Sequence, residues 1–114
     1  MEMMRELLHS DGFAVDLYRT YVWYQREAGE RIARRYLTAV SRTLESLRLH
    51  PGQGRLRCFQ SPLLREIRSG RVDAPFGAHL IFYRYSDDTL WAERLLHGSR
   101  DLQARLLEAP ETDS

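Results

Sequence analysis

The sequence predicts an α+β protein with the element order β-α-α-β-β-β-α, an antiparallel sheet and a helical hairpin packed on one face of that sheet. Three observations support this fold class. Two long stretches in the first half have apolar residues at helical spacing. The second half holds short β-branched and aromatic runs separated by turn residues. A last stretch, rich in Arg and Leu, is helical in character again.

The 114 residues suffice for one domain with one modest core. We expect this domain to span 1–109, followed by a disordered acidic tail at 110–114. No apolar run approaches the roughly 18 residues of a membrane span, and the acidic residues near the start exclude a signal peptide. The single cysteine, Cys58, fits a reducing cytoplasm.

The first half predicts one short strand and two helices. Residues 3–9 form the expected strand, and Ser10 begins a cap or turn signal. Apolar residues at helical spacing continue from Phe13 to Ala28, where Gly29 suits the left-handed position that follows a helix. A second helix is expected at 30–49. Its apolar stripe comprises Ile32, Ala33, Tyr36, Leu37, Val40, Leu44 and Leu47.

The middle of the chain, residues 50–77, is expected to form a loop, a strand and a second loop. Two prolines and two glycines place a loop at 50–62. The segment Leu63–Ser69 is the expected strand, and Pro75 prevents a strand in the second loop, Gly70–Gly77.

A β-hairpin and a helix complete the expected fold. The strands are His79–Tyr85 and Leu90–His97, joined by turn formers at 86–88. Ser99 is the expected N-cap of a helix from Arg100 to about residue 109. The register predicted on one face pairs Tyr85 with Leu90, Tyr83 with Ala92, Ile81 with Arg94 and His79 with Leu96. On the other face it pairs Arg84 with Trp91, Phe82 with Glu93 and Leu80 with Leu95.

All 17 basic residues are arginine, so each can make planar, bidentate contacts with carboxylate or phosphate. They are unevenly distributed, since the segment 54–71 holds five arginines and one glutamate while 101–114 is mostly acidic. A basic middle indicates an acidic partner or nucleic acid, and the residues leave direct nucleic-acid binding open.

The sequence gives no sign of a metal or cofactor site, because its histidines are scattered and no phosphate-binding glycine motif or nucleophile elbow occurs. Arginines and histidines on expected strands are the remaining candidates: Arg65, Arg68, His79, Arg84, Arg94 and His97. Arg can clamp phosphate and His can transfer protons in RNA cleavage. The alternative, favoured for each residue taken alone, is a structural role in pairs with Glu66 or Glu93 or in stacking on Trp91.

The whole pattern resembles the ParE branch of the ParE/RelE toxin superfamily, over about residues 3–106. The motifs that carry the resemblance are Phe13-x-x-Asp16-Leu17, Ala33-x-x-Tyr36, His50-Pro51-Gly52-x-Gly54-Arg55, Leu64-Arg65-Glu66-Ile67, His79-Leu80-Ile81-Phe82-Tyr83-Arg84 and Arg94-Leu95-Leu96-His97-Gly98-x-Arg100-Asp101-Leu102.

The resemblance implies a small cytoplasmic bacterial toxin of a type II toxin–antitoxin system, of the kind linked to growth arrest and plasmid stabilisation. Its expected partner is a ParD-like antitoxin of the ribbon-helix-helix class, whose flexible segment wraps the helical hairpin and the sheet. Exposed aromatic residues off the main helix stripe favour a protein interface. The expected antitoxin-binding residues are Tyr18, Trp23, Arg34 and Arg35.

The ParE branch is associated with poisoning of DNA gyrase without chemistry of its own. RelE-like relatives instead cut mRNA on the ribosome, in many cases with a tyrosine near the C-terminus, whereas the last tyrosine here is Tyr85. This difference favours gyrase, bound through Arg65, Arg68, His79, Arg84, Arg94, His97 and Arg100. Two alternatives stay open. One is an endoribonuclease in which Arg65, Arg68 and Arg84 hold phosphates and His79 or His97 transfers protons, and the other is a non-toxic relative that only binds an antitoxin.

Overall fold

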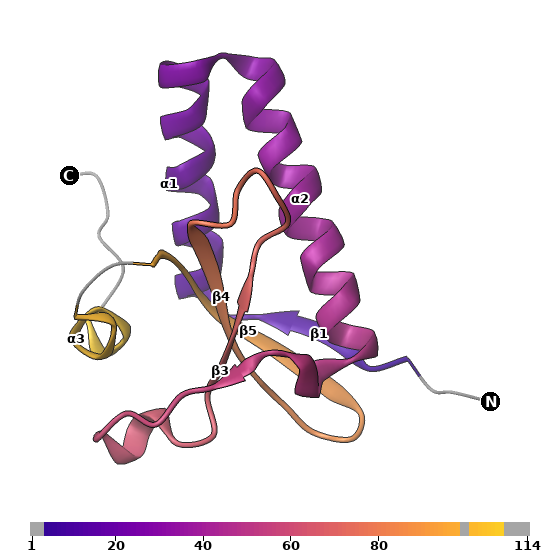
Figure 1. Ribbon diagram of the computed structural model, residues 1–114, viewed down its shortest axis with the longest axis vertical. Coiled ribbons are helices and arrows are strands. Elements are labelled where there is room, and N and C mark those ends of the chain that lie inside the picture. Colours follow the sequence, from indigo (N-terminus) through magenta and orange to yellow (C-terminus); the bar gives the residue numbers. More distant parts are fainter. Residues whose placement is uncertain (1–3, 99–100, 109–114) are drawn as a thin grey trace.

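A computed structural model describes residues 4–98 and 101–108, and it confirms the α+β class (Figure 1). The elements run β-α-α-β-β-β-β-α. Their bounds are β1 Glu6–His9, α1 Asp11–Ala28, α2 Glu30–Leu49, β2 Arg55–Leu56, β3 Arg68–Arg71, β4 His79–Tyr85, β5 Thr89–His97 and α3 Leu102–Leu107, with short 3-10 turns at Pro51–Gln53 and Pro62–Leu64. None of the described helices is long and apolar enough to cross a membrane.

The predicted helical hairpin is confirmed, and α1 and α2 stand side by side on one face of the sheet (Figure 1). Ser10 caps α1, because its hydroxyl accepts a hydrogen bond from the Phe13 amide at 3.0 Å. Gly29, with a φ of 91°, makes the turn between the helices, a conformation that residues with a Cβ rarely adopt. The stripe of α2 buries Ala33, Tyr36 and Val40, and the last two pack in the core against the sheet.

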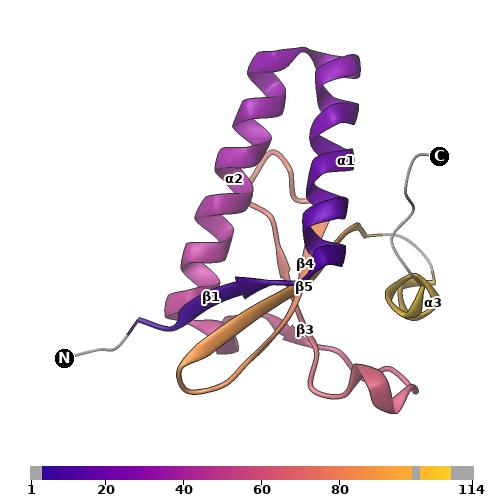
Figure 2. The ribbon, with the colours of Figure 1, turned by 180° about the vertical axis from the view of Figure 1, so that it is seen from behind.

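The sheet has the order β1-β5-β4-β3-β2 and is antiparallel except at one edge. There β1 runs parallel to β5, with Glu6 opposite Thr89 and His9 opposite Ala92. The sheet predicted to be antiparallel therefore has one parallel pair, at the β1 edge. The chain passes from β1 into α1, and β1 lies at the sheet edge beside β5, the last strand in the sequence, as Figure 2 shows from behind.

The predicted hairpin register is right only for its first half. Tyr85 faces Leu90, Arg84 faces Trp91 and Tyr83 faces Ala92, as expected. A β-bulge then leaves Glu93 without a partner on β4, so all later pairs shift by one residue. The observed pairs are Phe82 with Arg94, Ile81 with Leu95, Leu80 with Leu96 and His79 with His97. The Glu93 carbonyl instead accepts a hydrogen bond from the Ser10 hydroxyl at 2.6 Å, which links the bulge to the start of α1.

The strand predicted at Leu63–Ser69 is wrong in position. Pro62 opens a 3-10 turn capped by Ser61, and Glu66 has a φ of 61°, which a continuous strand does not allow. The strand β3 begins only at Arg68. It therefore includes Gly70 and Arg71, which were expected in a loop.

The loop predicted at 50–62 contains the short strand β2, which pairs with the start of β3. The chain enters β2 at Gly54, whose amide donates to the Tyr83 hydroxyl at 3.1 Å, while that hydroxyl donates to the Pro51 carbonyl. A Cβ at position 54 would lie 2.2 Å from this hydroxyl oxygen. Glycine is thus required at this point because the backbone comes so close to Tyr83.

Both faces of the sheet are covered, by different elements. The helical hairpin and the inner face form the larger core, which includes Tyr36, Ile81 and Tyr83. The outer face carries Leu80, Phe82 and Leu96, which pack against the segment 59–67 and against α3. The helical hairpin covers one face only, as expected, and α3 lies apart from it (Figure 2).

The C-terminal helix is shorter than expected, because α3 spans 102–107 where the sequence predicted 100 to about 109. The expected N-cap Ser99, the candidate Arg100 and the tail 110–114 lie outside the described residues.

Candidate target-binding surface

Arg94 on β5 is a structural junction between three elements. Its Nε and Nη2 donate to the Asp16 carboxylate of α1 at 2.7 and 3.1 Å. Its Nη1 donates to the carbonyls of Arg105 and Glu108 at the end of α3, at 3.0 and 2.9 Å. The Leu95 amide also donates to the Asp16 carboxylate, at 3.0 Å. Every nitrogen of this guanidinium therefore has an internal acceptor.

Arg84 on β4 is also engaged internally. Its Nη1 lies 2.5 and 2.6 Å from the two carboxylate oxygens of Glu93, the pairing that the structural alternative anticipated. Its Nε and Nη2 donate to the carbonyls of Arg65 and Leu63 at 2.9 and 2.5 Å. Arg84 thus holds the segment that precedes β3 against the outer face of the sheet.

His79 is buried beneath α1, where its Nε2 lies 2.9 Å from the Tyr24 hydroxyl. Its ring packs edge-on against those of Tyr36 and His97, with centroids 5.1 and 5.5 Å apart. Burial, and to a lesser extent the nearby His97, lower the pKa of His79 to about 4. His79 is therefore neutral near pH 7 and poorly suited to donate a proton.

The remaining predicted target-binding residues differ in exposure. Arg68 donates to the carbonyls of Gly54 and Gly52 at 2.8 and 3.3 Å, so it holds the loop before β2. Arg65 and the ring of His97 lie at the surface. The structure thus does not gather the predicted residues at one point, because most of their side chains bind neighbouring parts of the same chain.

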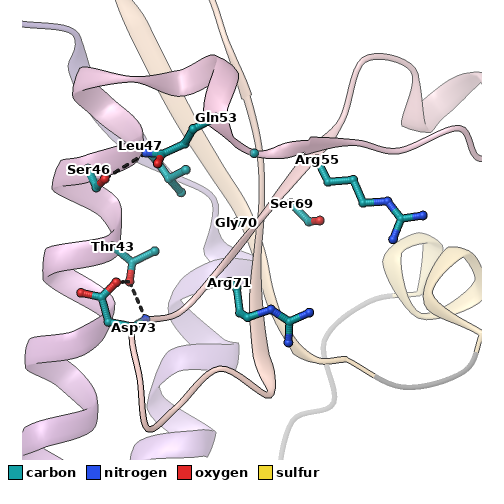
Figure 3. Close-up of a pocket in the computed structure, with 10 residues that line it drawn as sticks. Thr43, Ser46, Leu47, Gln53, Arg55, Ser69, Gly70, Arg71 and Asp73 are labelled. Atoms are coloured by element: carbon teal, nitrogen blue, oxygen red, sulfur yellow. Dashed lines mark hydrogen bonds between the residues drawn. The ribbon is translucent and has the colours of Figure 1, made fainter.

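A second group of arginines lies at the β2–β3 edge, where a cleft of about 170 Å³ opens between this edge and α2 (Figure 3). Arg55 and Arg71 line it, and both side chains extend away from α2. Arg57 belongs to the same group, since its Nε donates to the Ser69 hydroxyl at 2.8 Å. The arginine density of 54–71 was the available signal, but the misplaced strand prevented these residues from being assigned to one face.

The expected antitoxin-binding residues lie on the outer surface of the helical hairpin. Tyr18 and Trp23 are 70% and 55% exposed. Arg34 pairs with Glu30 at 3.0 Å on the surface of α2, and Arg35 is exposed. An apolar groove of about 560 Å³ runs along α1 beside Tyr18. Its lining includes Phe13, Leu17, Tyr21, Val22 and Leu37.

A helical hairpin on one face of a small, mostly antiparallel sheet is the architecture of ParE-like toxins. The chain is similar to a solved structure titled "Chromosomal ParDE TA system from P. aeruginosa", with a TM-score of 0.67 and 18% sequence identity. The alignment covers 84% of this chain and 98% of the other. The fold class is therefore the same.

The family follows from the sequence itself. The family model for the ParE toxin of the type II toxin-antitoxin system, parDE, matches residues 8–102. Because this match spans most of the chain, the protein belongs to the ParE toxin family, as its motifs suggested. No functionally curated protein matches the sequence.

Proposed function

We propose that this ParE-family toxin arrests growth by binding DNA gyrase, and that a cognate antitoxin neutralises it by covering the helical hairpin. Family membership supports the gyrase target, and the groove along α1 supports the antitoxin site. The single observation that carries the second part is the exposure of Tyr18, which lines that groove, together with that of Trp23 on the same helix. Large exposed aromatic residues rarely occur together on a surface that binds nothing.

The expected antitoxin segment is an amphipathic helix with acidic residues. Its apolar side would fill the groove lined by Phe13, Leu17 and Leu37, and its carboxylates would face Arg34 and Arg35 on α2. We expect the partner to be a small ribbon-helix-helix protein encoded beside the toxin.

Binding to such a partner is tested with Tyr18→Ala and Trp23→Ala. Each variant should weaken binding to the product of the adjacent reading frame by at least tenfold in calorimetry, because an aromatic anchor is lost. Leu63→Ala is the matched control, since Leu63 is 75% exposed but lies on the outer side of the sheet. Equal affinity of all three variants would contradict the site, and failure of the adjacent product to co-purify would contradict the partner.

The gyrase target is tested with the purified toxin in a supercoiling assay. Loss of supercoiling together with stabilised DNA cleavage is the expected result, and addition of the antitoxin should restore activity. Unchanged supercoiling without stabilised cleavage would refute the target while leaving the antitoxin site intact.

Cleavage of mRNA on the ribosome is the second candidate, favoured by the exposed positions of Arg65 and His97. The low pKa and burial of His79 argue against a proton-transfer role for that residue. Primer extension on mRNA after induction separates the candidates, since intact messages during growth arrest would exclude cleavage.

A further inference from the structure

Three arginines at the β2–β3 edge share one face of the sheet. Arg55 lies directly opposite Ser69, so their side chains point to the same side. Arg71 is two residues from Ser69. Arg57 is two residues from Arg55 and continues the pairing, because its amide donates a hydrogen bond to the Ile67 carbonyl at 2.9 Å. The arginines therefore line the outer face together.

The opposite side of this edge is occupied by α2, which fixes the direction in which the arginines point. A Cβ on Gly70 would lie 2.9 Å from Leu47 of α2, so Gly70 faces the helix and its neighbours Ser69 and Arg71 face away from it. Figure 3 shows Arg55 and Arg71 extending on that side.

Arg57 is held in place at the centre of the group. Its Nε donates to the buried Ser69 hydroxyl, and its guanidinium lies 5.8 Å from the centroid of the Phe82 ring. Burial, then the charges of Arg55 and Arg71, lower the pKa of Arg57. The charges of Arg55 and Arg71 thus both act on Arg57.

No carboxylate of the described residues neutralises this group. None of the ion pairs within 4–98 and 101–108 includes Arg55, Arg57 or Arg71. Asp73 also lines the cleft, but it is turned to α2, where the Thr43 hydroxyl donates to its carboxylate at 3.2 Å and accepts from its amide at 3.0 Å (Figure 3). A cluster of like charge without a counter-charge disfavours the folded chain, so a polyanionic ligand would relieve it.

We propose that Arg55, Arg57 and Arg71 form a binding site for the phosphodiester backbone of nucleic acid. The planar guanidinium fork matches phosphate oxygens, and a nucleic-acid strand supplies closely spaced negative charges to neighbouring arginines. An acidic peptide added as a further strand fits less well, because β2 offers only the two residues Arg55 and Leu56 for backbone pairing.

This site goes beyond the proposed binding of gyrase and antitoxin, and its test needs neither partner. The full-length chain is titrated into fluorescein-labelled 20-mers of duplex DNA, single-stranded DNA and RNA at several salt concentrations, and anisotropy is recorded. The triple variant Arg55→Gln, Arg57→Gln, Arg71→Gln should lose at least tenfold in affinity for the preferred nucleic acid. The slope of log K against log salt should flatten by about 2–3, at roughly 0.7–0.9 per lost phosphate contact.

The matched control removes the same charge elsewhere, through Arg26→Gln, Arg31→Gln and Arg42→Gln, all exposed on the helical hairpin. This control should bind within about threefold of the unmodified chain. The double variant Arg55→Gln, Arg71→Gln keeps the half-buried Arg57 and guards against misfolding, which circular dichroism also checks. It should still lose several-fold in affinity.

Equal losses in the triple variant and the helix control would overturn the site, because net charge alone would then explain binding. Absence of binding to all three nucleic acids would overturn it as well. A labelled poly-glutamate peptide is the last ligand, and its binding is measured in the same way. If that peptide binds through the three arginines and nucleic acid does not, the edge is a docking site for an acidic protein segment instead.

Discussion

Arg94 and Arg71 are both strand arginines, yet their surroundings are opposite. Arg94 finds a carboxylate and two helix-end carbonyls, and its side chain is 12% exposed. Among the described residues, Arg71 donates only to the Gly77 carbonyl, and it lies with other arginines at the β2–β3 edge. Arginine on this sheet therefore serves two purposes. One set joins elements of the fold through internal hydrogen bonds, and the other, at the β2–β3 edge, leaves positive charge for a ligand.

The largest effect is expected for Asp16→Ala, which tests the internally bonded arginines. It leaves the Arg94 guanidinium buried without its carboxylate, so the free energy of unfolding should fall by about 4 kcal/mol in urea denaturation. Glu45→Ala is the control, because its pair with Arg48 lies at the surface and should be worth less than about 0.5 kcal/mol. A loss below about 1 kcal/mol for Asp16→Ala would remove the distinction between the two sets of arginines.

Acid should destabilise the folded chain through His79. Its pKa is about 4 in the folded chain and about 6.5 when unfolded, so the unfolded chain binds more protons between these values. Stability is therefore fully present above pH 6.5 and declines as the pH falls towards 4, by roughly 3 kcal/mol. Carboxylates titrate in the same window, so the measurement is the difference between the unmodified chain and His79→Gln. Parallel pH profiles of the two proteins would show that His79 does not carry the effect.

The β2 edge of the sheet is held in place at Gly54, where the backbone contacts Tyr83. Gly54→Ala should lower the free energy of unfolding by about 2 kcal/mol, because its Cβ would overlap the Tyr83 hydroxyl and displace β2. Gly52→Ala is the control, since its Cβ would lie 3.7 Å from the Tyr85 hydroxyl, an ordinary contact. Thermal unfolding compares the two variants, and equal midpoints would contradict the anchor.

The smallest expected effect is an increase in the free energy of unfolding. Arg71→Gln removes one charge from the group at the β2–β3 edge, so it should raise the stability by a few tenths of a kcal/mol. Urea denaturation at low salt resolves such a gain best, because screening is weakest there. A loss of more than about 1 kcal/mol would mean that Arg71 is a structural residue like Arg94.

The parts of the fold that depend on local pattern were predictable from the sequence. The helix 30–49 is found with its observed bounds, because its apolar stripe, the glycine before it and the proline after it agree. The strand at 63–69 was misplaced because apolar residues in a 3-10 turn resemble a short strand. The backbone conformation of Glu66, which decides the matter, leaves no trace in a single sequence.

The candidate site was predictable in residue type more than in arrangement. The structural alternative for Arg84 and Glu93 proved correct, since the two side chains are close on adjacent strands. The partner of Arg94 was missed because Asp16 is distant in the sequence. Asp16 nevertheless lies on the buried stripe of α1 between Phe13 and Leu17, and a carboxylate at such a position requires a cationic partner. That requirement was the signal that could have found it.

The bulge at Glu93 also limits how this chain can change in length. Strand residues alternate between faces, so one extra residue inverts the alternation for everything that follows. Glu93 is that extra residue on β5, so its removal would leave Phe82 opposite Arg94 in an unbroken ladder and Leu95 on the inner face. Removing Leu95 instead would turn Leu96 to the inner face, because the alternation after it would be inverted. Position 93 is therefore the point at which β5 can lose a single codon and keep its later pairs.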